Sequence, residues 1–204
     1  MRLLIAILFA LPAACADMEG WLATEGPVYI WSKSEIDFHG QLRVNERPGH
    51  LGYGRVGAVS RTAVHPHLNI VAGYYFEERD AVDEQWLGGH RLFGGRDVRH
   101  RAGLWQFRGR VLLEQFLGVE GGAAYKRVRE RIQVGRAGLL NPYGSYEWVH
   151  DANGVQFMRS RGGVNFHAMP HASLDVSYSF DFRGERLGGN RQFILTTVEW
   201  EGRP

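Results

Sequence analysis

Long stretches of period-two alternation constrain this chain more than any other feature of its sequence. Between Ala172 and Phe182, apolar or aromatic residues alternate with serine or aspartate. Similar alternation runs through 34–45 and 67–77. Side chains of a β-strand point alternately to its two faces, so each segment is predicted to be a strand with one apolar and one more polar face.

Eleven candidate strands can be counted, and turn-forming residues separate them. The strands cover 22–32, 34–45, 52–63, 67–77, 85–93, 104–116, 124–135, 143–150, 159–167, 172–182 and 191–200. The predicted turns include Arg47-Pro48-Gly49, Gly94-Gly95, Gly121-Gly122 and Asp151-Ala152-Asn153-Gly154. No linker divides the chain, so we predict one all-β domain made of consecutive hairpins.

The length of the strands favours a membrane barrel. Ten to twelve residues match the ~9 to 11 that cross a bilayer at a tilt, whereas strands of soluble proteins average about half that length. Aromatic residues lie on the apolar faces, often near strand ends, as in the girdles of such barrels. These are Tyr29, Trp31, Trp105, Phe107, Tyr146, Trp148, Phe182 and Trp200.

We therefore predict a single closed, antiparallel, up-and-down transmembrane β-barrel of about 10–12 strands. A bacterial barrel with both termini in the periplasm needs an even number. A split around Glu25-Gly26-Pro27 would give twelve strands. Placing 85–93 in the lumen or in a loop would instead give ten.

The first residues predict export across the inner membrane. Arg2 precedes an apolar run, and Ala14-Cys15-Ala16 fits the pattern that a signal peptidase cleaves. We expect a signal peptide at residues 1–16 and an outer-membrane β-barrel domain at residues 17–204. Lipidation of Cys15 is the alternative, but Pro12 stands where a lipobox usually has leucine.

Charged residues gather on the polar faces of the later strands. The formal net charge of the chain is +2, which is no electrostatic footprint for nucleic acid. Because buried charges are normally paired, we expect them to meet inside the barrel and fill a narrow lumen. The alternative is a selectivity lining for a pore. The predicted lumen network is Arg108, Arg110, Glu114, Arg127, Arg129, Arg131, Glu147, Arg159, Arg161 and Asp175.

Glu130 does not fit this pattern. It falls on the same face as Val128, Ile132 and Val134, where contact with lipid is unfavourable. We expect either a β-bulge at this position or a different register of the strand.

Catalysis would need a nucleophile beside a base. The candidates are Ser60, Ser145 and Ser160 with His39, His90, His150 and His167, but none forms a local motif. We therefore assign no catalytic residue and favour a protein that is not an enzyme. His65 and His67 flank Pro66 in a predicted turn, and no second pair with ligand spacing accompanies them, so we predict no metal and no cofactor.

The order of several motifs resembles that of a known family. The motifs are Trp86, His90-Arg91, Arg108-Gly109-Arg110 with Glu114, Arg127 to Arg131, Tyr146-Glu147 and Tyr178. From Trp21 to Trp200 the chain resembles the uncharacterised bacterial outer-membrane proteins grouped as domain of unknown function 2490. The resemblance implies an outer-membrane barrel and no agreed activity or substrate. Ser160-Arg161 departs from the Asn-Arg pair expected there.

Three functions are compatible with these features, in order of preference. The first is a bacterial outer-membrane barrel with a charge-paired, largely filled lumen, acting as a structural protein or a narrow conduit. The second is an outer-membrane hydrolase that modifies lipid, and the third is a soluble periplasmic lipocalin-like binder. Outer-membrane lipid is the expected partner, and the sequence identifies no ligand.

Overall fold

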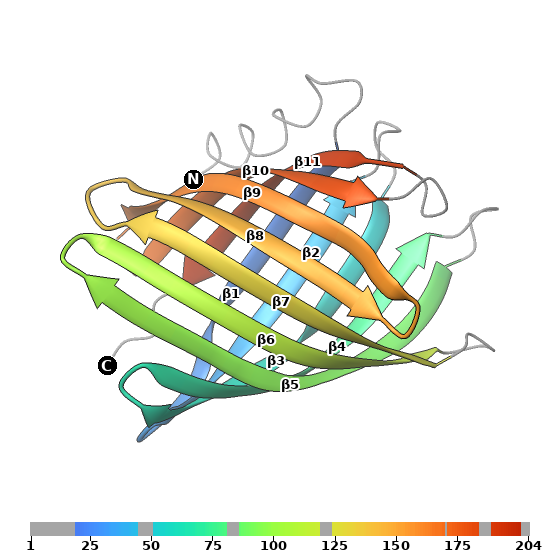
Figure 1. The fold of residues 1–204 in the computed structure, drawn as a ribbon, viewed down its shortest axis with the longest axis horizontal. Helices are drawn as coiled ribbons and strands as arrows, with labels where there is room; N and C mark the ends of the chain where they lie inside the picture. Colours follow the sequence, from blue (N-terminus) through green and yellow to red (C-terminus); the bar gives the residue numbers. More distant parts are fainter. Residues whose placement is uncertain are drawn as a thin grey trace.

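The computed structural model describes residues 19–44, 51–80, 86–118, 124–169, 171–183 and 189–200. These residues form a closed β-barrel of strongly tilted strands (Figure 1). No helix in the described part of the chain is long and apolar enough to cross a membrane. The predicted signal peptide and the predicted turns at 47–49 and 121–122 lie outside the described residues.

Eleven strands make the wall, and each is long enough to run from one mouth of the barrel to the other. They are β1 (Glu19–Trp31), β2 (Ser34–Val44), β3 (Leu51–His65), β4 (Leu68–Asp80), β5 (Trp86–Ala102), β6 (Trp105–Gly118), β7 (Tyr125–Arg136), β8 (Asn141–Asp151), β9 (Gly154–Met169), β10 (Ala172–Arg183) and β11 (Arg191–Trp200).

Strands that follow one another in sequence pair antiparallel, and a parallel pair of β1 and β11 closes the barrel. The prediction of a single closed all-β barrel of about 10–12 strands is therefore confirmed, and its pairs are antiparallel except at this closure. The expectation of an even strand number is wrong. With an odd number, the first and last strands run in the same direction, and a parallel ladder can still join them. The ladder extends from Glu19 opposite Phe193 to Glu25 opposite Glu199.

The parallel closure places the two ends of the wall at opposite mouths. The turns between β1 and β2, β3 and β4, and β5 and β6 lie at the left in Figure 1, and we call this end the short-turn mouth. Strand β11 finishes at this mouth with Trp200, whereas β1 starts at the opposite mouth with Glu19.

Two segments that sequence reasoning divided are continuous strands. β1 passes through Glu25-Gly26-Pro27, and the register shifts between Pro27 and Tyr29, directly after the proline, which has no N–H to donate. β5 passes through Gly94-Gly95, so the predicted turn there is wrong, and so is the alternative of 85–93 in the lumen or in a loop.

The outer surface of the barrel is mostly apolar and its inner surface mostly polar. Leu113 and Ile132 project outward with exposed fractions of 65% and 55%. On β2, Phe38 is exposed while its neighbours Asp37 and His39 are buried on the inner face. The faces predicted for β2, β4 and β10 are thus confirmed, with the polar side inward.

Glu130 lies on the outer face, as the alternation of β7 predicts. The ladders of β7 with β6 and with β8 run without a register shift at this point. Both explanations that we expected, a bulge and a different register, are therefore wrong. The Glu130 side chain is 49% exposed, and its carboxylate lies 3.6 Å from Nε2 of His150.

Candidate functional site

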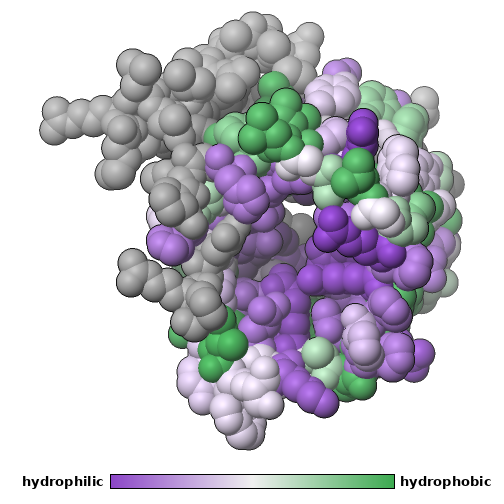
Figure 2. Space-filling model, turned by 90° about the vertical axis from the view of Figure 1, so that its left-hand side faces the viewer, coloured by the Kyte–Doolittle hydropathy of each residue, from purple (hydrophilic) through white to green (hydrophobic). Residues whose placement is uncertain are grey.

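A cavity of about 1230 Å³ occupies the lumen. Figure 2 looks into the short-turn mouth and shows hydrophilic side chains around a central hollow. Every residue of the predicted lumen network lines this cavity. Side chains therefore fill only part of the interior, which corrects the expectation of a largely filled lumen.

Asp97 is the centre of the first group of charges. It projects inward from β5, and its carboxylate is fully buried. The guanidinium of Arg108 binds it through two nitrogens, while Arg110 and Arg99 approach it to 3.1 and 3.3 Å. Three arginines thus share one carboxylate, and this corner of the lumen has an excess of positive charge.

Glu114 and Glu147 organise the second group along β6 to β9. Glu114 pairs with Arg127, with Arg129 at 3.4 Å and with Arg91 at 3.6 Å. Glu147 lies 3.8 Å from Arg129 and 3.6 Å from Arg159. Arg129 therefore bridges the two carboxylates.

A third group joins β9 to β10. Arg159 donates two hydrogen bonds of 2.6 and 2.8 Å to the two carboxylate oxygens of Asp181. Arg161 donates to Asp175 at 2.5 Å and to the hydroxyl of Ser177 at 2.7 Å. Such bidentate pairs combine charge with fixed geometry, and they hold neighbouring strands in register.

Sequence reasoning missed several members of this network. Asp97 was missing from the predicted lumen network because Gly94-Gly95 was interpreted as a turn, and the predicted strand therefore ended before Asp97. Arg91, from the same strand, is 3% exposed and pairs with Glu77 and Glu114. Asp181 stands on the polar face of the cleanest alternation in the chain, and that alternation was the signal that could have placed it in the lumen.

One part of the inner wall is apolar, which sequence reasoning did not predict. Val59, Val71, Tyr75, Phe93 and Leu112 form a buried cluster on β3 to β6. The ring of Tyr75 makes cation–π contacts with two arginines, since the guanidinium carbons of Arg55 and Arg91 lie 4.7 and 4.8 Å from its centroid. Arg55 also donates a hydrogen bond of 3.2 Å to Nε2 of His39.

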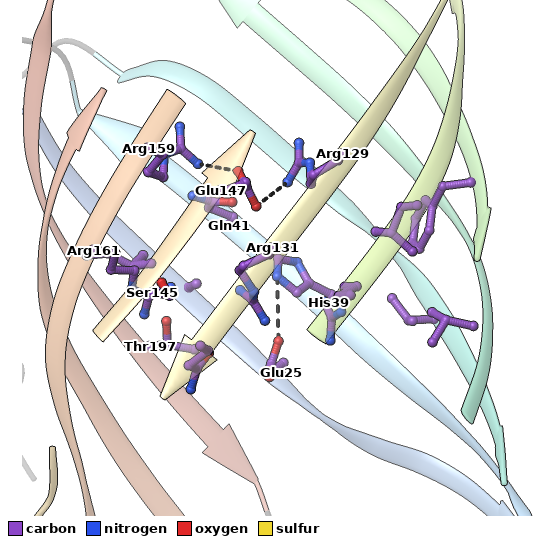
Figure 3. Close-up of a pocket in the computed structure, with 18 of the residues that line it drawn as sticks. Glu25, His39, Gln41, Arg129, Arg131, Ser145, Glu147, Arg159, Arg161 and Thr197 are labelled. Carbon is purple, nitrogen blue, oxygen red and sulfur yellow. Dashed lines mark ion pairs between the residues drawn. The ribbon is translucent and has the colours of Figure 1, made fainter. Parts of the chain in front are cut away.

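Arg131 differs from the other arginines of the predicted network. It stands opposite Glu147 in the ladder of β7 and β8, yet that carboxylate lies with Arg129 and Arg159. The guanidinium of Arg131 makes no ion pair, hydrogen bond or ring contact with any described residue. It points into the middle of the lumen (Figure 3).

Three of the four candidate histidines, His39, His90 and His150, have partners other than a serine. His39 contacts Arg55 and Glu25, and His90 contacts the hydroxyl of Tyr74 at 2.6 Å. His150 contacts Glu130, and within the described part of the chain none of these three histidines is hydrogen-bonded to a serine. His167 and Ser145 line the cavity.

The histidine pair at the turn between β3 and β4 has local partners. The backbone N–H of His67 donates to Nδ1 of His65 at 3.3 Å, and Nδ1 of His67 lies 3.1 Å from the carbonyl oxygen of Arg99. The described ranges contain no group of three or more histidine, cysteine, aspartate or glutamate side chains arranged to hold a metal ion.

These features define a closed β-barrel with an apolar outer surface and a lumen of networked charges around a cavity. Comparison with models of known protein families and with curated proteins finds no match for the chain.

Proposed function

We propose that this protein is a bacterial outer-membrane β-barrel that serves as a narrow conduit for small polar solutes. The observation that carries the proposal is the polarity of the wall. Apolar side chains face outward and charged side chains face a cavity, which is the arrangement of a membrane barrel and the reverse of a soluble one.

Aromatic residues at the short-turn mouth support the same proposal. Trp31 ends β1, Trp105 begins β6 and Trp200 ends β11, and all three are exposed on the outside of the wall. Tryptophan is favoured where hydrocarbon meets headgroups, so this mouth would lie at a membrane interface. Membership in the family of domain of unknown function 2490 and cleavage after Ala16 stay predictions.

The other two functions lack an observation in their favour. A hydrolase needs a serine beside a base, and His39, His90 and His150 have other partners. A lipocalin-like binder needs a polar outer surface, and this barrel exposes many large apolar side chains.

Cell fractionation, an unheated SDS gel and planar-bilayer recordings test the proposal together. We expect the protein in the outer-membrane fraction, a mobility that changes on boiling, and a small, steady conductance after reconstitution. Mass spectrometry of the purified protein would give the mature N-terminus, expected at Asp17. A soluble protein without a heat-dependent shift would refute the membrane assignment, and a membrane protein without conductance would refute the conduit.

Replacing Glu130 with leucine should stabilise the barrel in a bilayer. The carboxylate faces outward, where a charge in contact with lipid is unfavourable, so we expect a gain of about 1 kcal/mol in the free energy of unfolding. Urea unfolding from lipid vesicles measures it. The same change at the inward-facing Glu114 should destabilise, since Arg127 loses its carboxylate partner and Arg91 and Arg129 each lose one of two. A loss of stability in Glu130→Leu would contradict the lipid contact.

The odd strand number predicts the side on which each end of the wall emerges. A protease site placed just before Glu19 and one placed just after Trp200 should lie on opposite sides of the outer membrane, because β1 and β11 are parallel. Protease added to intact cells should therefore cleave only one of the two variants. Lysed cells serve as the control that both sites can be cleaved. Cleavage of both variants in intact cells, or of neither, would contradict the parallel pairing of β1 and β11, which we call the parallel seam.

A further inference from the structure

We propose that the lumen holds a binding site for small zwitterions, with Arg131 binding the carboxylate of the ligand and Glu25 and Glu199 binding its ammonium group. The proposal rests on the proposed conduit only for access from outside. It is carried by charged groups of opposite sign that line one cavity, where Arg131 makes no ion pair and the two glutamates make none with an arginine or lysine of the described chain.

The acidic side of the site lies on the parallel seam. Glu25 and Glu199 are direct neighbours in the ladder of β1 and β11, and both line the cavity. Neither makes an ion pair with an arginine or lysine of the described chain. Glu199 accepts hydrogen bonds from Asn165 at 3.1 Å and Ser173 at 3.3 Å, both neutral groups. Two adjacent carboxylates that no cation contacts directly repel each other, so an ammonium ion between them would be stabilising.

His39 does not supply the missing positive charge. Its Nε2 lies 3.8 Å from a carboxylate oxygen of Glu25 and 3.2 Å from a nitrogen of Arg55. A guanidinium can only donate, so Nε2 accepts the hydrogen bond and carries no proton in this arrangement. The ring is then neutral, and Glu25 has no direct cationic partner among the described residues, since Arg61, Arg108 and Arg110 act on it electrostatically without an ion-pair contact.

The basic side of the site lies on the far wall. Around the closed barrel β7 is five strands from β1 in one direction and six in the other, so Arg131 and Glu25 come from opposite walls. Glu25 is the seventh residue of β1 and Arg131 the seventh residue of β7, so both lie near the middle of their strands, and both line the same cavity. Figure 3 shows Arg131 pointing into the space near which Glu25, Thr197 and Ser145 lie.

The arrangement favours a zwitterion over a simple anion. An unpaired guanidinium alone would attract any carboxylate or phosphate. Here the nearby carboxylates would repel a plain anion and attract a ligand that also carries an ammonium group. Because the two sides face each other across the cavity, an extended ω-amino acid should bind more tightly than glycine.

Isothermal titration calorimetry of the full-length protein in detergent tests the site directly. The probes are 6-aminohexanoate, glycine, sodium acetate and methylammonium chloride. We expect 6-aminohexanoate to bind at least about tenfold more tightly than acetate or methylammonium, because each end adds a charge-assisted contact.

Variants separate the two sides of the site. Arg131→Gln should weaken both 6-aminohexanoate and acetate by about tenfold. The double variant Glu25→Gln, Glu199→Gln should lower 6-aminohexanoate binding to the level of acetate without weakening acetate. Arg96→Gln is the matched control, since Arg96 is exposed on β5, pairs in the ladder with the outward-facing Val111, and is absent from the cavity lining. Its binding should equal that of the wild type.

Three results would overturn the site. The first is 6-aminohexanoate binding no tighter than acetate, which would indicate a plain anion site. The second is wild-type affinity for 6-aminohexanoate in Arg131→Gln, and the third is a loss of affinity in Arg96→Gln equal to that in Arg131→Gln. The heat-dependent gel shift of each variant shows that the barrel is intact. Bilayer conductance is recorded separately, so a barrel that binds zwitterions without conducting would refute only the conduit.

Discussion

Replacing Asp97 with asparagine should lower the free energy of unfolding by about 3 kcal/mol. The change keeps the shape of the side chain but removes the charge that three arginines share at a fully buried position. Breaking a buried ion pair by removing one partner is strongly destabilising, because the remaining charge is left uncompensated. Urea titration of the folded barrel, followed by tryptophan fluorescence, measures the loss.

Glu35→Gln is the matched control for this variant. Glu35 also pairs with an arginine, but its side chain is 41% exposed, and Arg61 retains Asp37 as a second partner. An exposed pair contributes less than about 1 kcal/mol. Equal unfolding midpoints for the two variants would show that Asp97 does not organise the arginines around it.

Replacing Gly95 with valine should prevent normal closure of the barrel or lower its stability by at least about 3 kcal/mol. A Cβ atom at this position would lie 1.9 Å from the carbonyl oxygen of Val111 on the neighbouring strand. That oxygen belongs to the backbone of β6, so it cannot move without disturbing the ladder. The fraction of protein with the heat-dependent mobility and the urea midpoint both report the effect.

Gly109→Val provides the comparison on the adjacent strand. A Cβ atom there meets nothing within 4 Å, and valine suits the outward face of an extended strand. We expect a change within about 0.5 kcal/mol. If Gly95→Val folded as well as Gly109→Val, the close approach of β5 and β6 would not constrain this position.

Local alternation predicted the faces of individual strands well, because side-chain direction depends only on the strand itself. The positions of Arg129 and Glu147 on the inner wall follow from their own segments, and even Glu130 occupies the face that its neighbours predict. Strand continuity was harder to predict. Gly94-Gly95 has the composition of a turn, but glycine is also required where two strands approach closely, and only the neighbouring strand distinguishes the two cases.

The pairing of charges could not be predicted from single strands. Whether Arg131 or Arg129 binds Glu147 depends on rotamers and on the register of three strands. The parallel pairing of β1 with β11 was not predicted, because we expected both termini on the same side of the membrane and therefore an even number of strands. A closed barrel requires only that its two edge strands form hydrogen bonds with each other. The apolar cluster around Tyr75 lies on the face that alternation marked as the more polar one.

The seam also sets the order in which such a wall can assemble. Every other strand pair joins neighbours in sequence, so these contacts have low contact order and can form hairpin by hairpin. The pairing of β1 with β11 must close a loop of nearly the whole described chain, at the largest entropic cost. The ring centroids of Trp21 and Phe193 stack 3.9 Å apart, and Nε1 of Trp200 donates a hydrogen bond of 2.8 Å to the hydroxyl of Thr24. Both contacts join the two edge strands. Glu25 and Glu199 become neighbours only in this step, so the lumen acquires its acidic pair last.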